Sequence, residues 1–310
     1  MNPFVPPAPS PSVQGSEPPP DVPISIPPWT LKVQSYLFLY KLSKLTSPPT
    51  DSQFNPNNTA EILQGLPEGS YHPFEEIHPS ALQLVDGKPQ WQGGLATVAI
   101  VRYNESPVGP YDELIFIPGS FKDPHTKRAT GRVTTIFVST PQSVWNGRRN
   151  WNIQKHLARF EWAPNGSSST LKVYHPSTTS LPLSSTKAFF SAVITESWLP
   201  SLPINTAVFR SSGQIQPPLL PTRYPADSPL RESAIGTDDP AHGRDTPWLQ
   251  NFQTQKGWVK LAYVAGVEGS EGVLGDGIGY PKCKPWRVGF RFDGVLQFAE
   301  AHEVGRAKRD

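Results

Sequence analysis

The chain has 310 residues, with 28 basic and 26 acidic side chains and a formal net charge of +2. This charge is too small to predict a surface for nucleic acid or for an anionic membrane, so we expect a small-molecule partner. The single cysteine, Cys283, excludes an internal disulfide framework and a multi-cysteine metal site, and it fits a reducing, cytoplasmic compartment. The first residues do not resemble a secretory signal, so none is expected, and the sequence has no apolar run of about eighteen residues, so no membrane span is expected.

Proline dominates the N-terminal segment. Eleven of the first thirty residues are proline, which removes backbone donors and favours extended, solvated chain. We therefore expect residues 1–28 to be a disordered arm, followed by a single domain over 29–305 and a basic tail at 306–310. The domain begins with the alternating aromatic residues Tyr36, Phe38 and Tyr40, which are typical of a half-buried strand. The segment AEILQGLP then predicts a short helix.

From residue 94 onward, short apolar segments rich in β-branched and aromatic residues recur along the chain. Each is bounded by Gly, Pro, Asn or Ser and predicts a strand of about five to eight residues. These segments are 94–103, 112–119, 131–140, 169–176, 187–198, 205–216, 258–267 and 286–298. So many strands without regularly interleaved helices predict a mainly β domain, as an antiparallel sheet, barrel or sandwich. Residues 216–250 lack periodicity and predict a long loop, either a lid or a surface insertion.

Metal and nucleotide sites are not predicted. The seven histidines lack the short helical spacing of a zinc site. The glycine-rich segment VLGDGIGY has GxGxG rather than GxGxxG and predicts a turn. We therefore expect neither a metal ion nor another cofactor.

Residues 140–162 place one lysine between a predicted helix and a predicted strand. Thr140 followed by Pro141 is typical of an N-cap and a first helical position, so residues 141–149 should form a short helix. The following HLARFEW alternates as a strand does. If this strand begins at Lys155, then Lys155 and His156 point to opposite faces.

Tryptophan is abundant near this lysine. The chain contains nine tryptophans, whose large rigid rings pack well and whose ring N–H groups need hydrogen-bond partners. We expect most of them in the core. Trp145 and Trp151 lie close to Lys155 in the sequence and are candidates for the wall of a pocket.

Two segments resemble the acetoacetate decarboxylase family. GRRNWNIQKHLARF resembles the family segment in which a Gly-Arg pair precedes the Schiff-base lysine. Upstream, SPVGPYDELIFIPGSF resembles the Tyr-x-Glu segment whose glutamate faces that lysine. With a family-like Trp-Thr-Leu-Lys opening at 29–32, the resemblance covers about residues 29–200 and is closest to fungal-type members.

The resemblance implies a fold and an activity. It implies a large, bent, antiparallel β-barrel or cone with short peripheral helices, in a family whose members often form homo-oligomers. Lys155 matches the imine-forming amine and Glu113 matches the active-site carboxylate, beside Tyr111. The implied function is that of a lyase using a Schiff-base lysine on a keto acid or related carbonyl substrate, by decarboxylation or by aldol and dehydration chemistry.

This sequence also departs from the family pattern. His156 stands where the family has a second lysine, and Gln154 replaces a proline. The first strand lacks the family's arginine, for which Arg102 is a candidate substitute. These departures weaken the case for binding a keto carboxylate but leave imine chemistry on a neutral ketone or aldehyde intact. The candidate substrate-binding residues are Arg102, Tyr111, His156, Trp145 and Trp151.

Two other functions are compatible with the same residues. One is a non-imine isomerase or cyclase of fungal secondary metabolism that moulds an apolar metabolite in an aromatic-lined pocket. The other is a non-catalytic carrier, because large β-barrels often enclose a ligand. Fold class does not choose among the three.

Overall fold

The computed structural model describes residues 18–43, 63, 65–177, 185–208, 213–225, 228, 230 and 247–305. Strands dominate these residues, which confirms the predicted mainly β class. Residues 1–17 of the predicted arm, residues 60–62 and 64 of the helix expected at 60–67, most of 216–250 and the tail at 306–310 lie outside the described residues. Residues 63 and 65–67, which are described, form turns and a bend rather than a helix. No helix in the described part of the chain is long and apolar enough to cross a membrane.

The strands run, in chain order, as β1 (Trp29–Leu42), β2 (Trp91–Glu105), β3 (Tyr111–Ile117), β4 (Ser120–Lys122), β5 (Ala129–Gly131), β6 (Thr135–Val138), β7 (Lys155–Leu157), β8 (Arg159–Asn165), β9 (Ser168–Tyr174), β10 (Phe190–Glu196), β11 (Leu202–Asn205), β12 (Gln214–Gln216), β13 (Trp248–Asn251), β14 (Gln253–Ala265), β15 (Val288–Phe298) and β16 (His302–Val304). In the described ranges, the named helical elements are α2 (Pro79–Leu82), α3 (Pro141–Trp151) and the 3-10 turn η2 (Thr206–Val208). The strand predicted at 205–216 is replaced by the end of β11, η2 and β12, and the one predicted at 131–140 is divided between β5 and β6.

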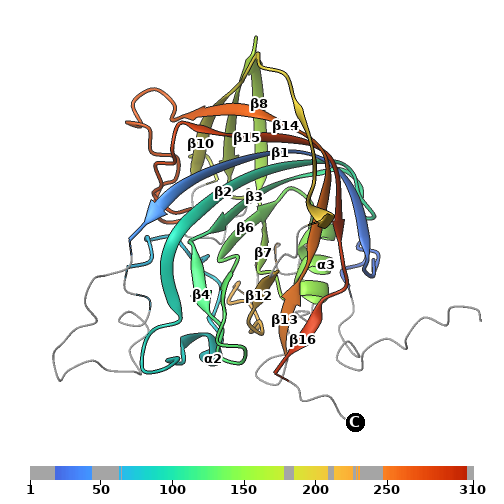
Figure 1. The fold of residues 1–310 in the computed structure, drawn as a ribbon, viewed down its shortest axis with the longest axis vertical. Coiled ribbons are helices and arrows are strands. Elements are labelled where there is room, and N and C mark those ends of the chain that lie inside the picture. Colours follow the sequence, from blue (N-terminus) through green and yellow to red (C-terminus); the bar gives the residue numbers. More distant parts are fainter. Residues whose placement is uncertain are drawn as a thin grey trace, which may run out of the picture.

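The strands form one branched sheet. Its main order is β16-β13-β12-β5-β4-β2-β1-β15-β14-β10-β9-β8, and β3, β6 and β7 branch from β2. The two end strands, β16 and β8, do not pair with each other in the described residues, so the sheet is strongly curved but not closed. Figure 1 shows β1, β2, β14 and β15 arching over β3, β6, β7 and α3.

The branch begins where β2 bends. Gly93 and Gly94 have φ angles of +70° and +105°, which glycine adopts far more readily than other residues. Before the bend, β2 pairs with β4, and after it Thr97 pairs with Ile117 of β3. The bend therefore lets one edge of β2 pair with two different strands.

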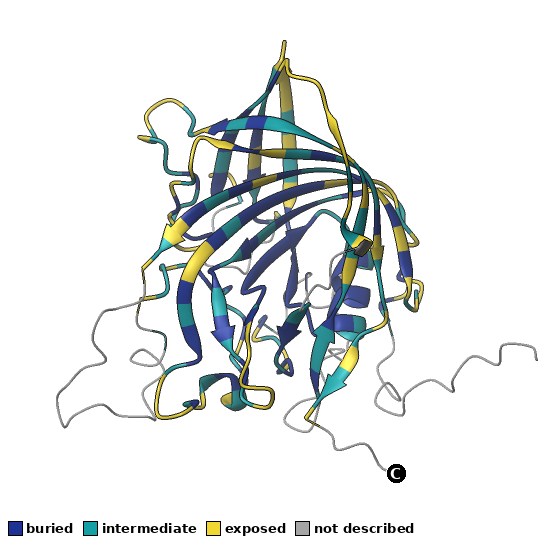
Figure 2. Cartoon of the chain, in the orientation of Figure 1, coloured by how far each residue is buried: buried dark blue, intermediate teal, exposed yellow. Residues whose placement is uncertain are grey.

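Two buried cores lie on opposite faces of the sheet. Strand β1 contributes to both, because its first half buries one face and its second half buries the other. Trp29, Leu31 and Val33 belong to a core that also contains Val144 and Trp151 of α3, which we call the α3-side core. Further along, Tyr36 and Tyr40 belong to a core that contains the apolar side chains of β10, which we call the β10-side core. Since successive side chains of a strand alternate between faces, the change from odd to even residues turns β1 from one core to the other. Figure 2 shows the buried residues of α3 and its surrounding strands.

Residues 18–28 contain no helix or strand and lie against α3. The Asn146 side chain accepts a hydrogen bond from Ser25 N at 2.7 Å and donates one to Pro23 O at 2.9 Å. Asn150 Nδ2 donates to Ser25 O at 2.8 Å, and Val22 is buried. This part of the proline-rich segment is thus bound to one face of the helix.

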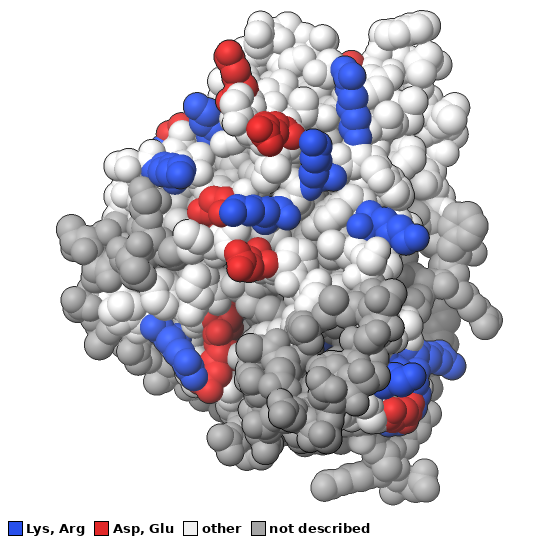
Figure 3. Space-filling view, turned by 90° about the vertical axis from the view of Figure 1, so that its left-hand side faces the viewer, with Lys and Arg blue, Asp and Glu red and all other residues white. Residues whose placement is uncertain are grey.

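Charged side chains of both signs are mixed on the surface. The face drawn in Figure 3 carries basic and acidic residues side by side, without a large patch of one sign among the described residues. On neighbouring strands, Lys260 Nζ lies 2.8 Å from Glu196 Oε2, and Arg291 also pairs with Glu196.

Candidate active site

The end of α3 directs the chain into β7. Thr140 is the N-cap and Pro141 the first helical residue, as predicted, although the Thr140 side chain makes no capping hydrogen bond. Asn152 ends the helix in the left-handed conformation, at φ 52°, and its N–H donates to Arg148 O. This tight ending lets β7 begin at Lys155, with the lysine side chain lying against the helix it follows.

Lys155 and Glu113 meet in the α3-side core. Lys155 Nζ lies 2.6 Å from Glu113 Oε2 and donates to Ser143 Oγ at 3.0 Å, and all three side chains are buried. Strand register explains the meeting, because Ile136 of β6 pairs with both Ile115 of β3 and Lys155 of β7. Paired residues of neighbouring strands face the same side of a sheet, and Glu113 lies two residues from Ile115.

One face of α3 is shaped for the lysine. Ser143, Gly147 and Trp151 are four residues apart and therefore lie on the same side of the helix. Ser143 contacts the Lys155 amine, Trp151 lines the cavity described below, and Gly147 lies beside the lysine stem. These three residues thus form the part of the helix surface that lies beside the Lys155 side chain.

Two tyrosines extend the polar contacts of Glu113. The Tyr103 hydroxyl donates to Glu113 Oε1 at 2.8 Å, and the Tyr103 and Tyr111 rings stack with their centroids 4.2 Å apart. Lys155 Nζ lies 5.4 Å from the Tyr111 ring centroid. Burial, and then the neighbouring Glu113 carboxylate, raise the pKa of both tyrosines well above the ordinary value. Both phenols therefore stay protonated at neutral pH and can donate hydrogen bonds.

These polar groups line a cavity of about 120 Å³. Its wall is mostly apolar and includes the side chains of Trp29, Leu31, Val101, Ile136, Trp151 and Ile153. The volume is close to the roughly 150 Å³ cavity that binds benzene in an engineered protein. The cavity is therefore large enough for a small carbonyl compound, or for the reactive end of a larger one.

Arg102, expected in the pocket, lies outside this cavity. It follows Val101 and precedes Tyr103, whose side chains both line the cavity, so the pleat of β2 turns Arg102 to the other face. There its Nε lies 3.3 Å from Asp112 Oδ1, and its guanidinium lies 4.7 Å from the centroid of the Trp162 ring. The structure thus does not bring Arg102, a candidate substrate-binding residue, into the cavity with Lys155.

Trp145 and His156 also lie away from the cavity. Trp145 is fully buried and is two residues from Gly147, which places it about 200° around the helix. His156 points to the face of β7 opposite Lys155, as the alternation of the strand predicts. Of the five residues proposed for substrate binding, Tyr111 and Trp151 line the cavity together with Lys155 and Glu113.

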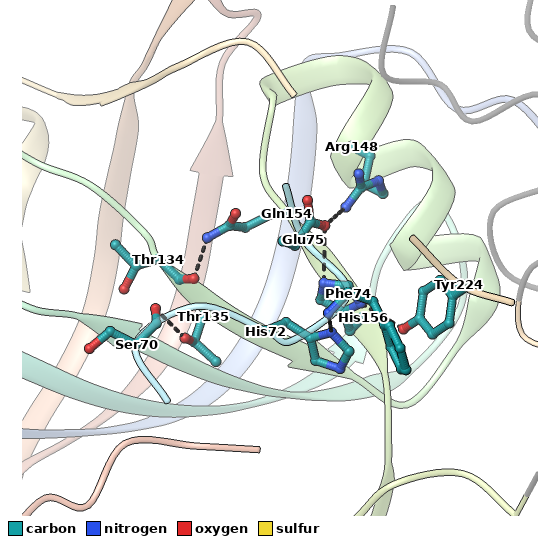
Figure 4. A network of polar contacts seen from close by, with 10 residues as sticks. All are labelled: Ser70, His72, Phe74, Glu75, Thr134, Thr135, Arg148, Gln154, His156 and Tyr224. Carbon is teal, nitrogen blue, oxygen red and sulfur yellow. Dashed lines mark hydrogen bonds and ion pairs between the residues drawn. The ribbon is translucent and has the colours of Figure 1, made fainter. Parts of the chain in front are cut away.

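His156 belongs to a second buried polar cluster, on the other side of β7 (Figure 4). Its Nδ1 lies 2.7 Å from the Tyr224 hydroxyl, and its ring stacks on that of His72 with centroids 3.6 Å apart. Its Nε2 lies 3.0 Å from Glu75 Oε1 but lacks hydrogen-bond geometry. Glu75 in turn forms a buried ion pair with Arg148.

The histidines of this second cluster are neutral at physiological pH. Burial lowers the pKa of His72 and His156 well below the usual range, and lowers that of nearby His175 to about 4. Burial raises the pKa of Glu75, against the opposing effect of Arg148. No three His, Cys, Asp or Glu side chains of the described residues are grouped as metal ligands.

Sequence reasoning missed Tyr103 and Ser143. Tyr103 pairs with Tyr111 across the β2–β3 hairpin. The short turn at 106–110, which contains proline and glycine, fixes the register of the two strands, so this pairing could have been predicted from the sequence. Ser143 lies four residues before Gly147, so helical spacing from the Gly-Arg pair identifies it as well.

Three solved structures resemble the chain at low sequence identity. Acetoacetate decarboxylase from Legionella pneumophila is 11% identical with a TM-score of 0.44, over 90% of this chain and 88% of the other. A second structure of acetoacetate decarboxylase is 10% identical with a TM-score of 0.46, over 94% and 96%. The enduracididine biosynthesis enzyme MppR, complexed with the condensation product of pyruvate and imidazole 4-carboxaldehyde, is 12% identical with a TM-score of 0.39, over 90% and 88%.

A scan of protein-family models gives no match to the chain, and a search of curated proteins gives no significant one. The TM-scores of the three structures are all below 0.5. These similarities therefore establish neither the family nor the activity of this protein.

Proposed function

We propose that this protein is an enzyme of the acetoacetate decarboxylase-like superfamily, of the fungal type, in which Lys155 forms an imine with a carbonyl substrate. The observation that carries the proposal is the 2.6 Å contact between Lys155 Nζ and Glu113 Oε2 at the wall of an apolar cavity. The two sequence segments that resemble the family contain the same two residues, which supports it further.

Stability alone does not account for this pair. Removing two charges from water costs several kcal/mol per ion, and buried ion pairs are often replaced by apolar residues at no cost in stability or with a gain of about 1–4 kcal/mol. An apolar pair would suit the surrounding Val138, Ile136 and Ile153 equally well. A chemical role for Lys155 and Glu113 explains why this cavity contains charged groups.

The groups at this site can supply and accept every proton that the proposed first step requires. A lysine attacks a carbonyl only as the neutral amine, and Glu113 is close enough to accept the ammonium proton. The nitrogen then bonds to the carbonyl carbon, the oxygen takes up the proton held by Glu113 and one released by the nitrogen and leaves as one water molecule, and an iminium remains. The phenol hydroxyls of Tyr103 and Tyr111 are donors that can assist the departing oxygen.

The iminium then withdraws electrons from the adjacent bond. It accepts the electron pair of a breaking C–C bond in decarboxylation or retro-aldol cleavage, or that of a C–H bond whose proton passes to Glu113 in dehydration. All three reactions share the Lys155 adduct. We therefore place the protein among lyases that use a Schiff-base lysine.

Reductive trapping tests the proposal. The protein is incubated with a ketone and sodium borohydride, and the peptides are mapped by mass spectrometry. We expect a secondary-amine adduct on Lys155 that exceeds labelling of surface lysines and disappears in Lys155→Met. Lys122→Met, at an exposed ion pair with Asp86, is the matched control and keeps the Lys155 adduct. Labelling spread evenly over surface lysines, with none on Lys155, would contradict the proposal.

A second candidate, a non-imine isomerase or cyclase, is favoured by the aromatic part of the cavity wall. The Trp151 ring stacks on Phe298 with centroids 4.3 Å apart and meets the edge of Trp29 at 4.9 Å. Such a wall can shape an apolar substrate without a covalent bond. Under this function, Lys155→Met retains turnover, whereas Trp151→Ala abolishes it.

A further inference from the structure

We propose that the substrate is an uncharged ketone or aldehyde with an apolar chain, bound with its carbonyl at Lys155 and its chain directed toward Leu37. This inference rests on the proposed imine function and, within it, favours retro-aldol or dehydration chemistry, because decarboxylation requires a substrate carboxylate. Two independent features carry it: the charges that line the cavity and the apolar surface at its mouth.

The cavity offers no second cation. Among the described residues that line it, Lys155 is the only basic side chain, and Glu113 is the only acidic one. Their charges cancel, and the two tyrosines are neutral donors. A substrate carboxylate would thus be buried without a cationic partner once Lys155 has bonded to the carbonyl, which strongly opposes binding.

Two arginines of the strands around the cavity, Arg102 and Arg291, lie on the other face of the sheet. Arg102 is turned away from the cavity by the pleat of β2, as described above. Arg291 of β15 pairs with Tyr36 of β1, whose side chain faces the β10-side core. Arg291 forms ion pairs there with Asp293 and Glu196. Neither arginine is available to a carboxylate inside the cavity.

Leu37, at the cavity wall, belongs to a group of exposed apolar side chains of the sheet, which we call the mouth strip and define as Leu37, Leu95, Val288 and Phe290. Leu37 itself lines the cavity and is 38% exposed. Its partner across β15, Phe290, is 44% exposed, and Val288, two residues further on, is 49% exposed. Leu95 of β2 is 54% exposed and is four residues from the cavity-lining Ala99.

Register places the whole mouth strip on the cavity side. Leu37 pairs with both Phe290 and Ala99, and paired residues share a face. Leu95 and Val288 are an even number of residues from these partners, so their side chains share that face as well. Exposed apolar side chains grouped at the mouth of a cavity mark a binding surface.

The substrate's own chain is the occupant that fits this surface. The mouth strip joins the cavity wall at Leu37, and the cavity of about 120 Å³ holds only a short part of a larger molecule. A longer apolar chain therefore leaves the cavity along Leu37 and covers Phe290 and Val288. A chain in this position gains about fourfold in affinity for each methylene that becomes fully buried.

Borohydride trapping with matched ketones tests the inference. The probes are 2-pentanone, levulinate, which carries a carboxylate in place of the last methyl group of 2-pentanone, and 2-heptanone. We expect half-maximal labelling of Lys155 by 2-pentanone at a concentration at least about tenfold lower than by levulinate. For 2-heptanone we expect a further decrease of about tenfold.

A variant at the mouth strip should shift the preference of the site from uncharged ketones toward levulinate. Leu37→Arg adds a cation at an exposed position, so labelling by levulinate should improve and labelling by 2-heptanone should weaken, each by about tenfold. Trp258→Arg is the control. Trp258 is 54% exposed, and its side chain lies on the face of β14 opposite to the one that its neighbours Gly257 and Val259 present to the cavity side. This control should leave both values unchanged.

The outcomes separate the inference from the proposed function. If levulinate labels Lys155 as well as 2-pentanone does, the uncharged-substrate inference is overturned while imine formation stands. If 2-heptanone gains nothing over 2-pentanone, the role of the mouth strip is overturned. If none of the probes labels Lys155, the proposed function itself fails.

Discussion

Gly147 of α3 lies directly against the stem of Lys155. A methyl group at Gly147 would stand 2.5 Å from Lys155 Cδ and 2.7 Å from Cε, closer than two carbon atoms can approach without displacement. The helix therefore requires glycine at this position in order to leave a path for the lysine. The Lys155 amine reaches Glu113 and Ser143 along that path.

Gly147→Ala should displace the amine and reduce trapping of Lys155 by at least about tenfold, since small misplacements of reacting groups cost that much or more. Stability should change less, because alanine favours the helix by about 1 kcal/mol over glycine and so offsets part of the clash. The two readouts are adduct yield and midpoint of thermal unfolding.

Gly131→Ala is the matched control for this change. A methyl group there meets Ile117 Cγ2 at 3.7 Å and Gln214 Cγ at 3.8 Å, which are ordinary contacts. The control should trap as the wild type does. Equal trapping by both glycine variants and the wild type would show that Gly147 does not position Lys155.

The buried ion pair predicts non-additive effects on stability. Lys155→Met leaves the Glu113 carboxylate buried without its partner, which should lower the free energy of unfolding by about 3–5 kcal/mol. Adding Glu113→Gln removes the uncompensated charge and retains an acceptor for Tyr103. The double variant should therefore regain at least about 2 kcal/mol relative to Lys155→Met.

Urea unfolding of the wild type, both single variants and the double variant measures this coupling. Simple addition of the two single effects would mean that the charges do not interact in the folded protein. The same four proteins separate stability from chemistry, because the recovered double variant still cannot form an adduct at position 155.

The sequence was sufficient for those parts of the site that depend on local spacing. Tyr111 and Glu113 are two residues apart on a strand, so their shared face follows from the pleat. The opposite orientations of Lys155 and His156 follow in the same way. The mainly β class was equally accessible, because many strand segments carry their own pattern of apolar residues and turns.

The remaining parts depend on pairing between distant segments. Whether Arg102 or Tyr103 faces Glu113 is decided by the register of β2 with β3, and a shift of one residue exchanges them. The parallel pairing of β6 with β7, which brings Lys155 to Glu113, has no local signal in either segment. The branching of the sheet at Gly93 and Gly94 is likewise a consequence of long-range pairing.

This register predicts contrasting effects for two adjacent residues of β2. Tyr103→Phe removes the donor to Glu113 Oε1 and should slow imine formation by about tenfold, since hydrogen bonds to charged groups contribute about 1.5–3 kcal/mol. Arg102→Ala removes a partly exposed ion pair with Asp112 and a contact with the Trp162 ring, both outside the cavity, and should change the rate by less than about twofold. Single-turnover trapping rates measure both, and a larger loss in Arg102→Ala than in Tyr103→Phe would contradict the observed faces.

The buried histidines behind β7 predict a loss of stability in acid. The pKa of His175 is about 4 in the folded protein and about 6.5 in the unfolded chain, because burial disfavours the charged ring. Between these values the unfolded chain binds a proton that the folded protein does not. The free energy of unfolding therefore falls as the pH drops from about 6.5 toward 4, and this contribution is constant below that range.

From pH 7.5 to 5.0, His175 alone should lower the free energy of unfolding by about 2 kcal/mol. His72 and His156 act in the same direction, because burial also lowers their pKa values. The raised pKa of Glu75 acts in the opposite sense, since its extra proton in the folded state stabilises the protein as the pH falls. Asp276 opposes the shift of His175 only partly.

Urea unfolding at pH 7.5 and 5.0 isolates the contribution of His175. In His175→Asn, the difference in unfolding free energy between the two pH values should be about 2 kcal/mol smaller than in the wild type, whatever the variant's overall stability. His302→Asn, at an exposed position of β16, is the control and should preserve the wild-type difference. An unchanged difference in His175→Asn would mean that His175 accepts its proton equally well in the folded and unfolded chains, against the burial seen beside Phe189 and Gly279.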